Sequence, residues 1–246
     1  MNPIPVTAAI AIGVIISAGN IARAVAAEPT AGTEPAPIAL PWTARGNEPG
    51  WILTLDENRM TYRTMDGMEV AAPLPKPAFA GGAWIYRAPQ KDLTASVQRK
   101  ICRDTMTGMP SPFSVSVQTG DKTLTGCGGN PSDLLGGGAW KVTVIGNEPV
   151  PENVNVSLEF DTAASQVFGS SGCNRYFGAF KLSGEGFRFE PGMAGSMMAC
   201  EEIPTRIERS FLSAMAKVQR FDIAPDGSLL LIMTDGTIKA RRDPGK

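Results

Sequence analysis

Two kinds of hydrophobic pattern occur along the chain: one with a period of two residues and one with the period of a helix. Apolar residues at every second position predict short strands, because successive side chains of a strand point to opposite faces. In the first half this pattern predicts strands at 51–56, 59–65, 83–88, 93–102, 113–119 and 122–127. Gly120-Asp121 suits a tight turn between the last two. No segment of this half has helical periodicity, so we expect a small antiparallel sheet or barrel.

The second half combines strands with one helix. Ile203, Ile207, Phe211, Met215 and Val218 recur at steps of three and four residues, which predicts one apolar helix face, joined by Leu212. Asp235-Gly236 is predicted to form the turn of a closing hairpin. The fold class expected for the whole chain is α+β, and we expect strands in the second half at 140–145, 154–160, 165–169, 176–182, 186–190, 228–234 and 237–242.

A tetrapeptide, Gly-Asn-Glu-Pro, occurs at 46–49 and again at 146–149. A true internal repeat would keep its other landmarks in register with these copies. The cysteines follow the two copies at different distances, and helical periodicity occurs in the second half alone. We therefore expect two different domains that share a turn-forming tetrapeptide by coincidence.

The N-terminus has the pattern of an export signal. Residues 1–22 carry no charge, 6–18 are apolar, and 24–27 read Ala-Val-Ala-Ala, which suits cleavage after Ala27. We predict a signal peptide at 1–27 and a periplasmic or secreted mature protein with no stable membrane insertion. An uncleaved membrane anchor is the alternative.

Composition sets the remaining boundaries. We predict a disordered lead-in at 28–41, rich in proline and alanine, and a β-rich envelope domain at 42–129. A glycine-rich linker at 130–139 then leads to the second domain at 140–243.

Four cysteines, Cys102, Cys127, Cys173 and Cys200, suit an exported chain with disulfides. Three pairings are possible. The pairing of sequence neighbours, Cys102 with Cys127 and Cys173 with Cys200, places one bridge in each half. Each bridge would close a loop of about 25 residues and contribute about 3–4 kcal/mol in the chain-entropy model. A cysteine metal site is disfavoured, because no two cysteines are close in sequence.

Charge and composition disfavour several classes of function. The chain has 23 basic and 24 acidic side chains and no histidine. It lacks the basic stripe of a nucleic-acid-binding protein, the usual general base and the commonest zinc ligand. We therefore expect no catalytic residues, no metal, no cofactor and no nucleic-acid partner, and we expect a monomer that is not an enzyme.

The second half resembles the META domain family, typified by the bacterial heat-shock protein HslJ. The resemblance rests on Trp140, on Gly-Ser-Ser-Gly-Cys-Asn-Arg-Tyr-Phe-Gly-Ala-Phe at 169–180, on Gly-Ser-Met-Met-Ala-Cys at 195–200, and on the helix and hairpin that follow. It implies an α+β fold with a curved sheet against one helix. It also implies an envelope setting, linked to stress and antibiotic tolerance rather than to established catalysis.

The first half is similar to an uncharacterised domain of bacterial envelope lipoproteins. The similar segments are Ala-Arg-Gly-Asn-Glu-Pro-Gly-Trp at 44–51, Cys-Arg-Asp-Thr-Met at 102–106, the strand at 112–117 and Leu-Thr-Gly-Cys-Gly-Gly at 124–129. Those proteins carry a lipid-acceptor cysteine, which this chain lacks after its apolar segment.

Asn174, Arg175 and Tyr176 are the first candidates for a binding site. Beside a disulfide, the two polar side chains and an aromatic platform would suit a carboxylate, a sugar or a peptide. The alternative is structural: Asn174 satisfies backbone groups in a turn and Arg175 forms an internal ion pair. Arg103 and Asp104 are further candidates, able to steer a charged partner or simply to lie in a solvated loop.

Two other features have structural explanations. Met193, Met197 and Met198 could bind copper(I) through sulfur, but methionine more often fills gaps in a core. Glu201 and Glu202 precede the helix, where acidic side chains favour the positive end of its dipole.

The leading hypothesis is therefore a non-catalytic interaction module whose partner is an unknown envelope protein or a small ligand. Two alternatives remain open. An inhibitor of a secreted hydrolase such as lysozyme would present the loop at 102–112 to an acidic cleft. A small-ligand carrier would need a cavity lined by the tryptophans and methionines of the first domain.

Overall fold

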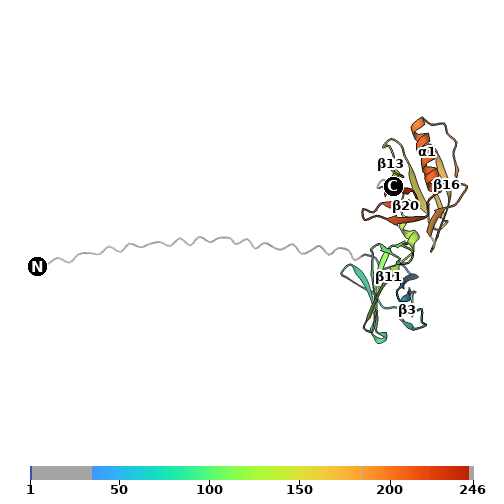
Figure 1. The fold of residues 1–246 in the computed structure, drawn as a ribbon. Helices are drawn as coiled ribbons and strands as arrows, with labels where there is room; N and C mark the ends of the chain where they lie inside the picture. The colour runs from blue at the N-terminus through green and yellow to red at the C-terminus, as the bar shows by residue number, and fades with distance from the viewer. Residues whose placement is uncertain (2–34, 185, 244–246) are drawn as a thin grey trace. The chain divides into compact units, whose positions relative to one another are not determined.

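The computed structural model describes Met1, residues 35–184 and residues 186–243. Apart from Met1, the predicted signal peptide (1–27) lies outside the described residues, as do residues 28–34 of the predicted lead-in. The described residues from Ala36 onward form one compact unit. Within the described part of this unit there are two large antiparallel sheets and one α-helix (Figure 1). Their buried side chains form two hydrophobic cores.

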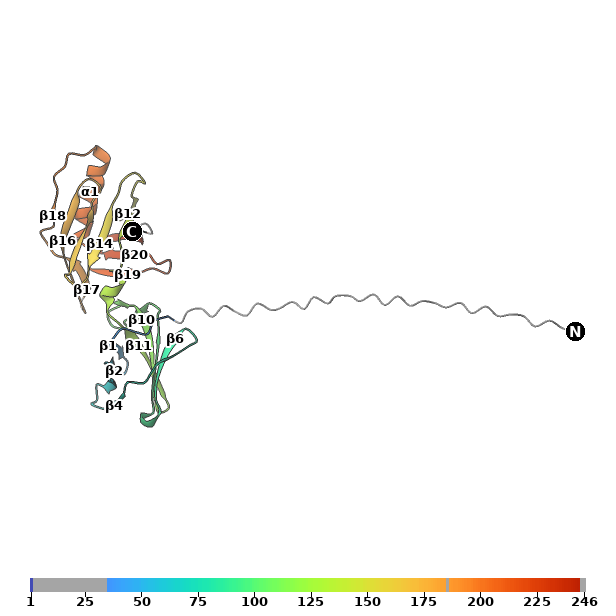
Figure 2. The same cartoon turned by 180° about the vertical axis from the view of Figure 1, so that it is seen from behind.

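The first sheet has nine strands in the order β4-β3-β2-β1-β11-β10-β7-β6-β5. This sheet forms a half-barrel. Figure 2 shows strands β10 and β11 in its middle, with β1, β2 and β4 on one side and β6 on the other. Its strands are β1 (Trp42–Asn47), β2 (Gly50–Leu55), β3 (Arg59–Thr64), β4 (Glu69–Pro73), β5 (Ala78–Ala80), β6 (Ala83–Ala88), β7 (Leu93–Gln98), β10 (Phe113–Thr119) and β11 (Lys122–Gly128).

Alternating burial along these strands forms the first core. Leu53, Met60, Val97 and Val117 are fully buried, and their sequence neighbours face outward. The six strands predicted in this half are present. Strands β1, β4 and β5 were not predicted, and the predicted lead-in at 28–41 ends earlier than expected, because Ile38 is already buried in this core.

Short elements complete the first half. A 3-10 turn (Pro89–Lys91) precedes β7, and the pair β8 (Cys102–Arg103) and β9 (Pro110–Ser111) forms a two-stranded ribbon beside the main sheet. Gly120 and Asp121 form the predicted two-residue turn, since Thr119 pairs with Lys122.

The second sheet has ten strands around one helix. Its main path is β17-β16-β15-β14-β12-β21-β20-β19. The elements are β12 (Trp140–Ile145), β13 (Glu148–Pro149), β14 (Ser157–Asp161), β15 (Gln166–Ser170), β16 (Arg175–Ser183), β17 (Gly186–Phe189), β18 (Ala194–Gly195), α1 (Glu202–Met215), β19 (Arg220–Ile223), β20 (Leu229–Met233) and β21 (Gly236–Arg242).

This sheet curves until its two ends meet, further than the expected open curved sheet. The backbone N–H of Phe187 in β17 donates to the carbonyl of Gln219 just before β19, at 3.0 Å. The rings of Phe187 and Phe221 pack edge to face at 5.7 Å. The sheet is therefore a near-barrel, and its aromatic residues fill one end of the core.

Helix α1 buries one face against the second core, as its periodicity predicts. Ile207, Phe211 and Met215 are buried, and the Phe211 ring packs edge to face on Tyr176 of β16. Ile203 is the exception, because it lies in the first turn and is half-exposed. Glu202 occupies that turn, where its charge suits the helix dipole.

The segment predicted as a linker, 130–139, packs on the second core. It contains a 3-10 turn (Pro131–Leu134), and Leu135 is fully buried. Trp140 donates through Nε1 to the carbonyl of Leu135 at 2.8 Å, and the Arg242 guanidinium lies 3.8 Å from the Trp140 ring. Arg242 also donates to the carbonyls of Leu134, Gly136 and Gly138.

The two Gly-Asn-Glu-Pro copies occupy different positions in their hairpins. In the first, Asn47 pairs with Gly50, so Glu48 and Pro49 form the turn. In the second, Ile145 pairs with Glu148, so Gly146 and Asn147 form the turn. This two-residue offset agrees with a coincidental match. The closing hairpin is also offset from its prediction, because Gly236 pairs with Met233 and the turn residues are Thr234 and Asp235.

Candidate functional site

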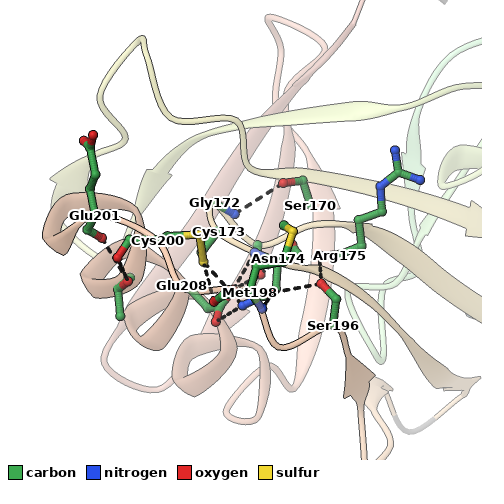
Figure 3. The surroundings of a disulfide bond; sticks show 12 residues. Ser170, Gly172, Cys173, Asn174, Arg175, Ser196, Met198, Cys200, Glu201 and Glu208 are labelled. Atoms are coloured by element: carbon green, nitrogen blue, oxygen red, sulfur yellow. Dashed lines mark hydrogen bonds between the residues drawn. A yellow bond between two sulfur atoms is a disulfide. The ribbon is translucent and has the colours of Figure 1, made fainter.

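The four cysteines pair as sequence neighbours, Cys102 with Cys127 and Cys173 with Cys200. The second bridge joins the loop between β15 and β16 to the segment that precedes α1. Figure 3 shows this bridge beside Asn174, with Glu208 reaching the same point from the helix. Three segments distant in sequence therefore meet at the predicted site.

Asn174 connects these three segments through its side chain. Its Oδ1 accepts hydrogen bonds from the Ser196 hydroxyl and the Met198 backbone N–H, both at 2.8 Å. Its Nδ2 donates to Glu208 at 3.0 Å. With its amide engaged on both sides and only 9% of its surface exposed, Asn174 serves the structural role expected of the alternative interpretation.

Glu208 is the acceptor on the helix side of this network. Its carboxylate accepts from the Ser171 hydroxyl, from the Asn174 backbone N–H at 2.9 Å and from the Asn174 amide. Partial burial opposes ionisation, but the hydrogen bonds from Ser171 and Asn174 outweigh it and lower the pKa of Glu208. The sequence pattern did not identify Glu208 as a residue of this site, because the helix carries several other polar residues and nothing in the pattern distinguishes Glu208 from them.

Tyr176 cannot serve as the predicted aromatic platform, because it faces the core. Its side chain is 4% exposed, and its hydroxyl donates to the carbonyl of Ser157 at 2.9 Å. Burial raises the pKa of Tyr176 well above its usual range. The alternating pattern of β16 places Arg175 and Phe177 on the opposite face of the strand.

Arg175 is the one predicted residue of this loop that faces solvent. Figure 3 shows its side chain extending away from Asn174 and Glu208. Within residues 35–184 and 186–243, the Arg175 guanidinium forms no ion pair and no hydrogen bond, and an internal ion pair stays an untested alternative. A free guanidinium at the end of an exposed strand can bind a carboxylate.

An exposed aromatic pair lies on the same outward face. Phe177 of β16 is 63% exposed and pairs in register with Phe168 of β15, which is 40% exposed. On its other side Phe177 pairs with Ala194 of β18. This pair was not predicted from the sequence, although strand alternation around the buried Tyr176 and Phe180 indicates that Phe177 faces outward. We call Phe168, Arg175 and Phe177 the outer face.

The methionines of the following segment are divided between core and solvent. Met193 packs partly buried against the second core, as expected. Met197 is fully exposed and Met198 is more than half exposed, so the prediction that they fill core gaps is wrong for these two. No cluster of three metal-binding carboxylate, histidine or cysteine residues occurs in the described part of the chain.

Arg103 and Asp104, the other predicted residues, both have partners. Arg103 forms an ion pair with Asp222 at 2.9 Å and donates to the carbonyl of Ile223. Asp104 accepts from Asn47 and from the backbone N–H groups of Met106 and Thr107. Partial burial opposes ionisation of Asp104, but these hydrogen bonds outweigh it and lower its pKa. Both residues hold the 102–110 loop in place.

Comparison with known proteins identifies the second half. Residues 133–243 match the META domain family. No curated protein matches the chain. Among solved structures, the NMR structure of a protein from Burkholderia xenovorans aligns with this chain at 25% sequence identity and a TM-score of 0.38. The alignment covers 47% of this chain and 89% of the Burkholderia xenovorans protein. A likeness this loose supports no functional argument. The similarity of the first half to envelope lipoproteins stays a prediction.

Proposed function

We propose that this chain, whose residues 133–243 are a META domain, is an exported envelope protein that binds a partner protein and is not an enzyme. META domains are envelope-type domains, and two disulfides fit a compartment outside the cytoplasm. Within the described residues, no helix has the length and apolar character needed to cross a membrane. A periplasmic or secreted location and a link to stress or antibiotic tolerance are parts of the proposal, drawn from the family.

The observation that carries the proposal is the exposed pair Phe168 and Phe177. Directly opposed residues in an antiparallel pair lie close enough for their side chains to form one surface. Complete burial of a phenylalanine side chain contributes about 1.5–3 kcal/mol, and Phe168 and Phe177, which are 40% and 63% exposed, lack part of this contribution. An exposed aromatic cluster of this kind is typical of an interface, where aromatic residues are enriched.

The partner's chemistry follows from the charge beside this pair. Arg175 is two residues from Phe177 on the same strand face, and its guanidinium is unpaired within the described residues. A polypeptide segment with apolar side chains next to a carboxylate would complement both features.

A hydrolase inhibitor is less well supported. The loop proposed to enter an acidic cleft is held by the Cys102–Cys127 bridge, by Asp104 and by the Arg103–Asp222 ion pair, and Met106 is its exposed large side chain. The basic side chain of this loop is engaged with Asp222, which leaves little positive charge for an acidic cleft. Inhibition of lysozyme stays a hypothesis that a direct activity assay would test.

The proposal is tested by capture from an envelope extract of the source organism with three immobilised proteins: the wild type, Phe177→Ser and Met65→Ser. Met65 is an exposed apolar residue of the first half, 80% exposed, and its replacement is the matched control. We expect one protein to be retained by the wild type and by Met65→Ser, and retention by Phe177→Ser to fall at least about tenfold, as for an interface hot spot.

Equal retention by the wild type and Phe177→Ser would contradict the proposed surface. Retention of no protein by the wild type would contradict the proposed function itself. If a protein is captured through the outer face, a deletion strain complemented with Phe177→Ser is expected to be as stress-sensitive as the uncomplemented strain.

A further inference from the structure

A groove of about 860 Å³ lies at the end of the first sheet where β1 begins, and its lining extends to Asn130, Asp133 and Leu134. Its apolar walls include Ile38, Leu40, Trp42, Ile101 and Phe113. This volume falls in the range of small-molecule sites, about 300–1,000 Å³. Of the tryptophans expected to line the cavity of a carrier, Trp42 lines this groove, whereas Trp51 and Trp84 are buried in the core.

The wall formed by Trp42 is closely packed. Trp42 is 7% exposed, and its ring packs edge to face on Phe113 at 5.8 Å. A Cβ on Gly128 would lie 2.3 Å from the Trp42 ring, so the absence of a side chain there lets the ring lie against β11. The buried Trp42 Nε1 has no hydrogen-bond partner among the described residues. A preformed apolar wall lowers the ordering cost of binding an apolar ligand.

Two exposed cations, Arg99 and Lys100, line the same groove. The Arg99 guanidinium lies 5.2 Å from the centre of the Phe113 ring and 5.8 Å from that of Trp84. Neither cation has an ion-pair partner within the described ranges. Asp133 is the single carboxylate among the described lining residues, so positive charge exceeds negative charge.

We propose that this groove binds an amphiphile with one anionic head group and a single alkyl chain, such as a medium-chain carboxylate. The alkyl chain would contact Ile38, Leu40 and Trp42, and the carboxylate would pair with Arg99 and Lys100. An acidic peptide is disfavoured, because the buried walls are apolar side chains that offer its amide groups few hydrogen-bond partners. This site is separate from the outer face and does not depend on the proposed function.

The test is titration of the oxidised full-length protein with decanoate, followed by tryptophan fluorescence and by calorimetry, with decanol as the uncharged analogue. We expect saturable binding of one decanoate and weaker binding of decanol. Lys100→Gln is expected to weaken decanoate binding about fivefold, and Arg99→Gln somewhat more. Lys91→Gln, which removes an exposed cation outside the groove lining, is the matched control and is expected to bind as the wild type does.

Three results would overturn the proposal: no saturable binding up to millimolar decanoate, equal binding of decanol, or equal binding by the wild type and Lys100→Gln. Arg99 packs on two rings, so its variant is interpreted after its thermal unfolding matches the wild type. Among the described residues Lys100 has no ring contact of this kind, so its variant remains informative if Arg99→Gln unfolds.

Two further measurements identify the source of the ligand and separate the two proposals. Displacement of decanoate by phosphatidylglycerol vesicles would support a lipid as the natural source, and retention of decanoate would support a free carboxylate. Phe177→Ser is expected to bind decanoate normally, so loss of the partner protein and loss of decanoate binding are distinguishable.

Discussion

At the scale of single residues, Asn174 and Glu208 hold the disulfide loop to helix α1. Asn174 accepts from the 196–198 segment and donates to Glu208, while Glu208 also accepts from Ser171. Asn174 is buried and Glu208 is half-buried, so removal of either side chain takes hydrogen bonds from the other. Arg175, next in sequence, takes no part in this network through its side chain, and it is the residue of this loop to which we assign a binding role in the proposal.

Replacement of Asn174 by alanine is expected to lower the free energy of unfolding by about 1–3 kcal/mol, because its hydrogen bonds to Ser196, Met198 and Glu208 are lost. Arg175→Ala is the control and is expected to change it by less than about 0.5 kcal/mol, as is usual at an exposed position. Urea denaturation of both variants measures the difference. Similar stability of the two variants would contradict the structural role of Asn174.

Glu208 makes stability depend on pH in a defined direction. Its pKa is lower in the folded state than in the unfolded state, so its contribution is complete above the unfolded value, about 4.3. The contribution is lost as the pH falls through the lower folded value. Between pH 7 and pH 3 we expect the wild type to lose more stability than Glu208→Gln, measured by urea denaturation at both pH values. A parallel pH dependence would show that Glu208 ionises alike in both states.

The sequence predicted which loop residues matter but not their roles. Spacing and composition predicted both disulfides and drew attention to Asn174 and Arg175. The inward direction of Tyr176 follows from strand alternation that begins at Arg175, and an error of one residue in that register exchanges the two faces. The network through Glu208 could not be predicted, because it joins residues far apart in sequence.

At the scale of elements, close packing of neighbouring strands accounts for where glycine is required. A Cβ on Gly169 of β15 would lie 2.1 Å from the carbonyl oxygen of Ser157, on the neighbouring strand β14. No side chain can relieve this contact, because the obstacle is backbone. The pairing of β14 with β15, which positions Phe168, therefore depends on glycine at this position.

Gly169→Ala is expected to destabilise the protein by about 2–4 kcal/mol, because the strands must separate to admit the methyl group. Gly184→Ala is the control, since no described atom lies within 4 Å of its Cβ position and its φ lies outside the left-handed region. Thermal unfolding of both variants makes the comparison. A midpoint for Gly169→Ala equal to that of Gly184→Ala would mean that the strands approach less closely than described.

Elements with strong periodicity were the ones that the sequence predicted well. Strands with clear alternation and the helix with a single apolar face were found within a few residues of their expected bounds. Strands β4, β5 and β19 are short and weakly patterned, and their partners in the sheet determine their conformation. Burial of Leu135 and the contacts of Arg242 order a segment whose glycine content predicted a linker.

At the scale of the whole described unit, each half has its own core and its own disulfide. The ion pair of Arg103 in β8 with Asp222 in β19 joins the two. Its side chains are 45% and 24% exposed, so solvent screens the attraction. We infer that each half is stable mainly through its own core.

A double-mutant cycle of Arg103→Ala and Asp222→Ala is expected to give a coupling free energy below about 1 kcal/mol, as is usual for partly exposed pairs. Urea denaturation of the wild type, both single variants and the double variant supplies the four values. A coupling of about 3 kcal/mol would show that the halves depend on this contact and would contradict independent cores.

The measurement that tests the central claim most directly is photo-cross-linking in intact cells of the source organism. A photoreactive phenylalanine analogue replaces Phe177 in one strain and the exposed Met65 in another. We predict one cross-linked product of defined mass from position 177, absent from position 65 and lost when Phe168 is replaced by serine. No product from position 177, or the same product from both positions, would contradict an outer face that binds a protein partner.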